Sequence, residues 1–339
     1  MKNILGFLFL IFTMTSCYDD YVKDYTYDAI YFTYQLDVRT FVVGEGMKFD
    51  YGVGLGGVMT NKRSRTVDYI IDPTLITPDI LTSMKASSLS FIKSATAPVT
   101  TLSLLPANYY SLTNGSQFII EKGQNTGRVT IRPDSALFLA DPNSLNPNYV
   151  LPLLITRADA DSLLHLKRYT VIGVKYENML FGNYWHGGVT VEKTPAGDIV
   201  PPVVDSKGNV TKPNPTNYFT AIPSPESTIW LLKTTAPFEL TVNGYSNQTN
   251  TTKQELKLTL NLVDGTVAVG SATGSTYSYS ADGACTYNKA KLLQNRKIYL
   301  KYKYALANGN TCYATDTLTF RNRIRDGINE WEDENPAHY

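Results

Sequence analysis

Paired carboxylates are the side chains in this 339-residue sequence that could do acid–base chemistry. Asp159 with Asp161, and the acidic run from Glu332 to Glu334, could supply the acid and the base that cleave a glycosidic bond. The pair lies in a loop-like segment and the run lies in a polar tail, so neither pattern indicates the fixed geometry that this chemistry needs. His165, in a leucine-rich stretch, and the penultimate His338 do not indicate a Ser/His/Asp arrangement. We therefore predict that the protein is not an enzyme.

A cysteine near the N-terminus predicts a lipid anchor. It belongs to the sequence Met14-Thr15-Ser16-Cys17, which follows Lys2 and a short apolar run and resembles a lipobox. At a lipobox a signal peptidase cleaves before a cysteine that carries diacylglycerol. The apolar run is much shorter than the about 20 residues of a membrane-spanning helix. We expect residues 1–16 to be a signal peptide, Cys17 to be lipidated and residues 17–28 to form a tether.

The other two cysteines, Cys285 and Cys312, lie in strand-like segments near the C-terminus. In an exported protein they could form one disulfide or remain two buried thiols, because the sequence does not place their Cα atoms. The three histidines and the cysteines form no pairs at metal-ligand spacing. We expect no metal site and no cofactor.

The charge balance argues against a nucleic-acid partner. Loss of residues 1–16 would remove one base, Lys2, from 31 Lys+Arg and no acid from 30 Asp+Glu, which leaves a neutral chain. Nucleic-acid binding needs a basic face that displaces counterions, and the densest basic cluster is only Asn61 to Arg65. We expect no nucleic-acid binding, and the neutral balance also disfavours a receptor for polyanions.

The dominant period along the first half of the chain is two, which is typical of strands with one buried face. Short strands separated by turn residues predict an immunoglobulin-like β-sandwich over residues 29–176. Two short stretches, Pro78 to Lys85 and Ala158 to Leu164, are helix-like. The expected strands are 29–34, 47–55, 67–71, 117–121, 127–132, 149–156 and 168–174.

A second set of strands begins at Asn183, so we place a domain boundary near residue 176. A proline-rich loop from Thr194 to Asn217 follows, and its composition should not build a ladder. Beyond it, Asp264-Gly265 and Asn308-Gly309 are hairpin signals between strands of alternating polarity. About eight strands joined by hairpins predict a lipocalin-like β-barrel over residues 177–339, with a second β-sandwich as the alternative. The whole chain is therefore predicted to be all-β.

Three blocks in the first half carry a family resemblance. In order, they are Leu105 to Tyr110 (LPANYY), Phe118 to Gly123 (FIIEKG) and Asn148 to Leu153 (NYVLPL). They resemble an N-terminal module of surface glycan-binding lipoproteins from Bacteroidetes polysaccharide-utilisation loci. The second half opens with Phe181 to Gly188 (FGNYWHGG) and resembles the C-terminal domain that often follows this module, which is associated with a lipocalin-like barrel. Asp19-Asp20, directly behind Cys17, resembles the signal that sends Bacteroidetes lipoproteins to the outer face of the outer membrane.

The resemblance implies a non-catalytic lipoprotein, anchored in the outer membrane and facing the cell exterior, that captures oligo- or polysaccharides. It would act beside a TonB-dependent transporter and the substrate-capturing lipoprotein of that transporter. Two other classes of function remain open. One is a barrel that carries a small apolar ligand, and the other is a structural subunit of an outer-membrane or fimbria-like assembly.

Aromatic side chains are the candidates for contact with a glycan. A neutral sugar stacks its C–H face on an aromatic ring while polar groups bind its hydroxyls, so exposed rings near loops are expected to bind it. In the second half we select Trp230 and Tyr218 first, followed by Tyr245 and Trp331.

Other aromatic residues of the second half are expected to be structural. Trp185, shortly after Gly182, is expected to close one end of the barrel, as the tryptophan after glycine does in lipocalins. Tyr302 and Tyr304 alternate with lysines, so we expect their rings to face the interior.

Overall fold

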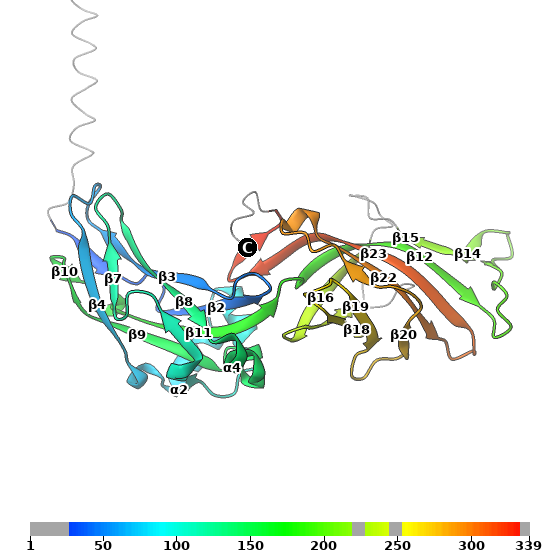
Figure 1. The fold of residues 1–339 in the computed structure, drawn as a ribbon, viewed down its shortest axis with the longest axis horizontal. Coiled ribbons are helices and arrows are strands. Elements are labelled where there is room, and N and C mark those ends of the chain that lie inside the picture. Colours follow the sequence, from blue (N-terminus) through cyan, green and yellow to red (C-terminus); the bar gives the residue numbers. More distant parts are fainter. Residues whose placement is uncertain (1–26, 219–227, 244–252, 333–339) are drawn as a thin grey trace, which may run out of the picture.

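The computed structural model describes residues 27–218, 228–243 and 253–332, and this part of the chain is all-β, as predicted. Its strands surround two main groups of buried apolar side chains. One group comes from residues between Ile30 and Tyr176, and the other from residues between Leu180 and Phe320. Figure 1 shows the two corresponding regions side by side, and we refer to them as the N-terminal and C-terminal regions.

The N-terminal region is a sandwich of two sheets. The chain changes sheet between its first two strands, and the second of these pairs in parallel with the last strand of the region, an arrangement typical of immunoglobulin-like folds. This confirms the predicted sandwich. In sheet order, the strands of one sheet are β10 (Ser162–Leu163), β1 (Ala29–Tyr31), β3 (Phe49–Gly56), β8 (Thr126–Pro133) and β6 (Tyr110–Leu112). Those of the other are β2 (Leu36–Val43), β11 (Tyr169–Asn178), β9 (Tyr149–Ala158), β4 (Arg65–Ile71) and β7 (Gln117–Ile120), with β5 (Ser103–Leu104) beside β9.

The helices are short, and no helix in the described ranges is long and apolar enough to span a membrane. Helix α2 (Pro78–Lys85) matches the predicted helical stretch. Proline suits its first turn, because backbone N–H groups there have no partner within the helix and proline has no N–H. The other helices are α3 (Ser90–Thr96), α4 (Ser135–Ala140), and the 3₁₀ turns η1 (Pro73–Leu75), η2 (Ala107–Tyr109), η3 (Pro142–Leu145), η4 (His165–Lys167) and η5 (Leu293–Asn295).

The segment from Ala158 to Leu164 is not helical, contrary to prediction. Its backbone pairs with β1 through the short strand β10, and Asp161 accepts a hydrogen bond from the Asp28 N–H while its own N–H donates to the Asp28 carboxylate. Asp159 forms an ion pair with Arg63 at 2.8 Å. The two carboxylates that resembled an acid–base pair therefore hold a turn and the edge of a sheet.

The C-terminal region is one large antiparallel sheet in which most strands lie beside the next strand along the chain, and the first long strand also pairs with the last. Its two edges meet where Val267 N–H donates to the Cys285 carbonyl at 2.9 Å, next to a bridge between Thr266 and Thr286, so the sheet is a nearly closed barrel. The strands are β12 (Gly182–Lys193), β16 (Thr228–Ala236), β17 (Glu239–Asn243), β18 (Gln254–Leu260), β19 (Val267–Ser271), β20 (Tyr279–Ala281), β21 (Thr286–Tyr287), β22 (Lys297–Ala305) and β23 (Thr311–Arg325). Two short strands extend the sheet, β15 (Thr216–Tyr218) beside β12 and β24 (Ile328–Glu330) beside β23.

Local sequence explains how this sheet folds. Gly265 has φ of +82° in the turn between β18 and β19, and Gly309 has φ of +86° between β22 and β23, a conformation that glycine adopts without strain. Tyr302 and Tyr304 are buried, as predicted from their alternation with lysines. The proline-rich segment does contain paired backbone, contrary to prediction: β13 (Val203–Val204) pairs with β14 (Val210–Lys212), because the prolines flank these short strands rather than occupy them.

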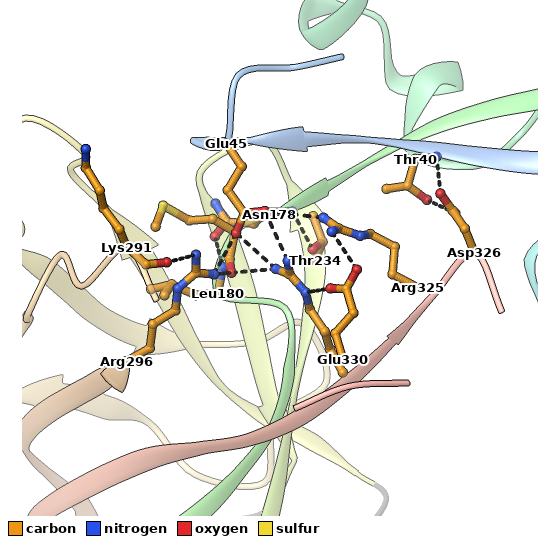
Figure 2. Close-up of polar contacts among 12 residues, drawn as sticks. Thr40, Glu45, Asn178, Leu180, Thr234, Lys291, Arg296, Arg325, Asp326 and Glu330 are labelled. Atoms are coloured by element: carbon orange, nitrogen blue, oxygen red, sulfur yellow. Dashed lines mark hydrogen bonds and ion pairs between the residues drawn. The ribbon is translucent and has the colours of Figure 1, made fainter. Parts of the chain in front are cut away.

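A buried ion network joins the two regions. Glu45, in the turn after β2, accepts two hydrogen bonds from the Arg323 guanidinium, at 3.1 and 3.0 Å, and lies 2.7 Å from Arg296 and 3.3 Å from Arg325. Glu330 binds Arg323 and Arg325 from the other side. Figure 2 shows Glu45 reaching from the N-terminal region toward the guanidiniums of the C-terminal region.

The electrostatics of this junction favour the charged state of its carboxylate. Burial alone would raise the pKa of Glu45, but the guanidiniums of Arg323, Arg296 and Arg325 outweigh burial and hold the pKa below its ordinary value. Thr40 adds a second link, because its hydroxyl donates to the Asp326 carboxylate at 2.7 Å. The junction is thus a paired, hydrogen-bonded arrangement of the kind that buried charges require.

Candidate functional site

Two of the predicted ligand-binding aromatics, Trp230 and Tyr218, come together inside the barrel-like sheet. His186 of β12 lies between them: its ring stacks on Trp230 with centroids 4.0 Å apart and an angle of 11°, and its centroid is 4.6 Å from that of Tyr218. Trp230 is only 1% exposed and Tyr218 only 9%. The expectation that these two rings are exposed is therefore wrong.

The burial of Trp230 follows from its strand. It lies opposite Tyr184 in the pairing of β16 with β12, and both residues occupy the positions that alternate toward the core. Alternation with a period of two does not say which face of a strand is buried. The pairing of β16 with β12 decides this, and the sequence of β16 alone does not reveal that pairing.

The interior cluster also contains a carboxylate. Asp316 lies 3.1 Å from His186 Nε2 and accepts a hydrogen bond from the Tyr302 hydroxyl at 2.8 Å. Burial first, and then the charge of Asp316, raise the pKa of Tyr218. His186 and Asp316 are both fully buried, and their side chains form a close polar contact inside an apolar core. We assign this cluster a structural role.

The remaining predicted residues do not join the cluster. Trp331 is 58% exposed directly after β24, at the end of the sheet that forms the junction. Cys285 and Cys312 are both buried free thiols, so of the two alternatives the structure has the unpaired one. Tyr245 and Cys17 lie outside the described residues.

The opposite side of the same strands carries aromatic rings that are partly exposed to solvent. We call the outward-pointing side chains of β12, β23 and β22 the outer face, and these three long strands are labelled side by side in Figure 1. Three rings lie on the outer face, those of Trp185, Tyr313 and Tyr299, and each alternates with buried neighbours along its strand. Trp185 therefore does not close the end of the barrel, contrary to prediction, because Tyr184 and His186 on either side of it point inward.

The strand pairing sets the positions of these rings. Trp185 lies opposite Thr319, and Tyr299 opposite Thr317, so the two rings flank β23 two residues apart. Tyr313 lies four residues before Thr317 on β23, about 13 Å along the strand at about 3.3 Å per residue. Beside the rings, β23 presents outward threonines, which supply hydroxyl donors and acceptors: Thr311, Thr315, Thr317 and Thr319. The outer face thus combines aromatic surface with hydrogen-bonding groups.

Cations lie over two of the rings. The Arg321 guanidinium carbon is 5.0 Å from the centroid of Trp185. Lys193 Nζ is 4.9 Å and Lys303 Nζ 5.9 Å from the centroid of Tyr313. These distances are typical of cation–π contacts.

Sequence reasoning selected tryptophans and tyrosines near loops and so missed the outer face, which lies on strands. The sequence did contain a signal that could have predicted the outer face. The Asn308-Gly309 turn sets the register of β22 against β23, and this register places Tyr299 and Tyr313 on the same side of the sheet as the lysines of β22.

A hollow of about 810 Å³ lies at the junction between the two regions. Its lining is mixed and includes Phe91, Phe181, Arg325 and the ion pair between Lys175 and Glu177. Burial raises the pKa of Glu177 even though Lys175 counteracts it. A hollow of this size is large enough for a small molecule.

Comparison with known proteins gives partial matches. A family model with the description "-like, N-terminal domain" matches residues 22–162. A protein of unknown function from Bacteroides ovatus, solved in structural genomics, superposes with a TM-score of 0.60 at 20% identity over 91% of this chain and 98% of its own. A multidomain protein including DUF1735, also from Bacteroides ovatus, superposes with a TM-score of 0.42 at 13% identity over 90% of this chain and 100% of its own. None of the curated proteins matches. The first superposition shows that the fold of nearly the whole chain occurs in a Bacteroides protein.

Proposed function

We propose that this protein is a non-catalytic glycan-binding lipoprotein that uses the outer face of its C-terminal region to hold oligo- or polysaccharides. The observation that carries the proposal is the row of Trp185, Tyr299 and Tyr313 beside the outward threonines of β23. Aromatic rings supply apolar surface for the C–H face of a sugar, and threonine hydroxyls match its hydroxyl groups. No step in this function requires bond cleavage.

The proposal includes a place for the protein in the cell. The lipobox-like sequence ending at Cys17 and the acidic residues behind it support an anchor in the outer membrane, facing the exterior. By the resemblance, glycan held there would pass to a TonB-dependent transporter and its substrate-capturing lipoprotein. The superposition with a Bacteroides protein is consistent with this setting.

A small-ligand carrier is the second candidate, and the hollow at the junction is the feature that favours it. The ligand would then lie between the two regions rather than inside the barrel-like sheet, where tyrosine, tryptophan and leucine side chains from most strands pack together. A carrier should release a bound small molecule when the purified protein is denatured and extracted.

The test is a glycan array followed by affinity titration of the mature chain from Tyr18 onward. We expect saturable binding that Trp185→Ala weakens about fivefold, because one aromatic contact contributes about 1 kcal/mol. Trp331→Ala is the matched control, since it removes an exposed tryptophan that is not on the outer face. Binding lost in Trp331→Ala and kept in Trp185→Ala would reject the site, and no binding across a broad panel would reject the function.

A further inference from the structure

Positive charge is concentrated on the outer face. Five cations point outward from its three strands: Lys193, Lys297, Lys301, Lys303 and Arg321. The outward positions of the same strands carry no aspartate or glutamate. The two acidic residues nearest in sequence, Glu192 and Asp316, point inward and are already engaged, Glu192 by Lys212 and Asp316 by Tyr302.

These cations are not neutralised within the described part of the chain. Only Lys303 has a carboxylate partner, Asp282, at 3.6 Å on the neighbouring edge of the sheet. Lys193, Lys297, Lys301 and Arg321 form no ion pair with any described residue. A chain with 31 Lys+Arg and 30 Asp+Glu thus carries a local excess of positive charge that its net charge conceals.

The placement of the cations bears on which sugars fit. Arg321 lies over Trp185 and Lys193 over Tyr313, so positive charge is held directly beside the aromatic surface. A ligand with anionic groups would accept hydrogen bonds from the guanidinium and ammonium groups, in addition to any contact with the rings. These contacts therefore favour a charged sugar over a neutral one.

We propose that the outer face selects anionic glycans, whose carboxylate or sulfate groups pair with Lys297, Lys301, Lys193 and Arg321. This inference rests on the proposed glycan-binding function and adds the chemical class of the ligand. It also reverses, for this one face, the expectation from net charge that a polyanion is disfavoured.

The experiment compares matched polymers that differ in charge. The mature chain is titrated with polygalacturonate and with its fully methyl-esterified form, and with dextran sulfate and dextran. Each titration is made at about 0.1 M and at about 1 M salt, where the Debye length falls from about 10 Å to about 3 Å. We expect the charged member of at least one pair to bind at least about tenfold more tightly than its neutral partner, and high salt to abolish the difference.

Two variants distinguish the effect of the outer-face cations from the effect of the overall charge of the protein. Lys297→Gln/Lys301→Gln/Arg321→Gln should lose the preference for the anionic polymer, whereas Lys62→Gln/Lys122→Gln/Lys207→Gln, which removes as much charge from exposed positions elsewhere, should keep it. Thermal unfolding of both variants should match the wild type, because all six residues are exposed.

The outcomes distinguish this inference from the proposed function. Equal, salt-insensitive binding of neutral and charged polymers would overturn the inference and leave glycan binding intact. Binding of phosphatidylglycerol vesicles or duplex DNA without binding of any glycan would overturn both, and so would a failure to bind every probe.

Discussion

The junction and the outer face use cationic side chains in opposite ways. At the junction, three guanidiniums surround Glu45 and Glu330, and both Arg323 and Arg296 are about 1% exposed. On the outer face, five cations lie at the surface, and only Lys303 among them pairs with a described carboxylate, that of Asp282. The cations are therefore neutralised at the buried junction and left mostly unpaired on the outer face.

Under the proposed function, the junction uses its charges for stability and the outer face uses its charges for ligand binding. A buried charge without a partner costs several kcal/mol, so the fold must pair the junction cations internally. An exposed cation without a partner lowers the free energy of unfolding very little, and it remains available to bind an external anion. Removal of a charge should therefore change stability at the junction and ligand binding on the outer face.

Substitution of Glu45 by alanine should have the largest effect on stability. It leaves Arg296 and Arg323 buried with less compensation, for which we expect a loss of about 3–5 kcal/mol in the free energy of unfolding. Urea denaturation followed by tryptophan fluorescence measures this loss. Asp282→Ala, which breaks the exposed pair with Lys303, is the control and should cost less than about 1 kcal/mol. Equal losses for the two substitutions would contradict the comparison.

The second largest expected effect is that acid reduces the contribution of the junction to the free energy of unfolding. The pKa of Glu45 is lower in the folded protein than its ordinary value of 4.5, so its contribution to stability is complete above pH 4.5 and is lost as the pH falls through the folded value. Glu45→Gln cannot titrate. The difference in unfolding free energy between wild type and Glu45→Gln should thus be constant at neutral pH and shrink below pH 4.5. A difference that grows on acidification would show that the arginines do not stabilise the carboxylate.

The smallest expected effect on stability concerns the outer face. Lys301→Gln should change the free energy of unfolding by less than about 0.5 kcal/mol, because its side chain is exposed and forms no ion pair with a described residue. Differential scanning calorimetry at neutral pH measures this. A loss comparable with that of Glu45→Ala would mean that the outer face is structural, which would weaken the argument for recognition.

Sequence patterns predicted much of the fold because they depend on local chemistry. Alternation predicted strands, Asp264-Gly265 and Asn308-Gly309 marked turns, and the stretch from Pro78 to Lys85 is a helix. The prediction of a helix at Ala158 to Leu164 is wrong, because the segment pairs with β1, which lies more than a hundred residues earlier in the chain, and this pairing makes it extended.

The candidate site was less predictable, because it depends on contacts between distant segments. Glu45 and Arg323 lie 278 positions apart, and neither residue alone indicates a buried pair. Trp230 and Trp185 are both tryptophans on strands, yet the first points into the core and the second lies half-exposed on the outer face. Only the pairing of β12 with β16 and β23 separates them, and that pairing is a property of the folded sheet.

The parallel pairing of β2 with β11 has a mechanical consequence. The two strands are in register from Leu36 beside Val171 to Val43 beside Asn178, and β11 leads directly into β12 of the outer face. If the chain is anchored at its N-terminal end and a polymer bound to β12 is pulled, as the proposed function implies, the load acts on opposite ends of these parallel strands. Their hydrogen bonds then bear the force together, in shear, instead of opening one at a time, so the N-terminal region should resist extension while the polymer is under tension.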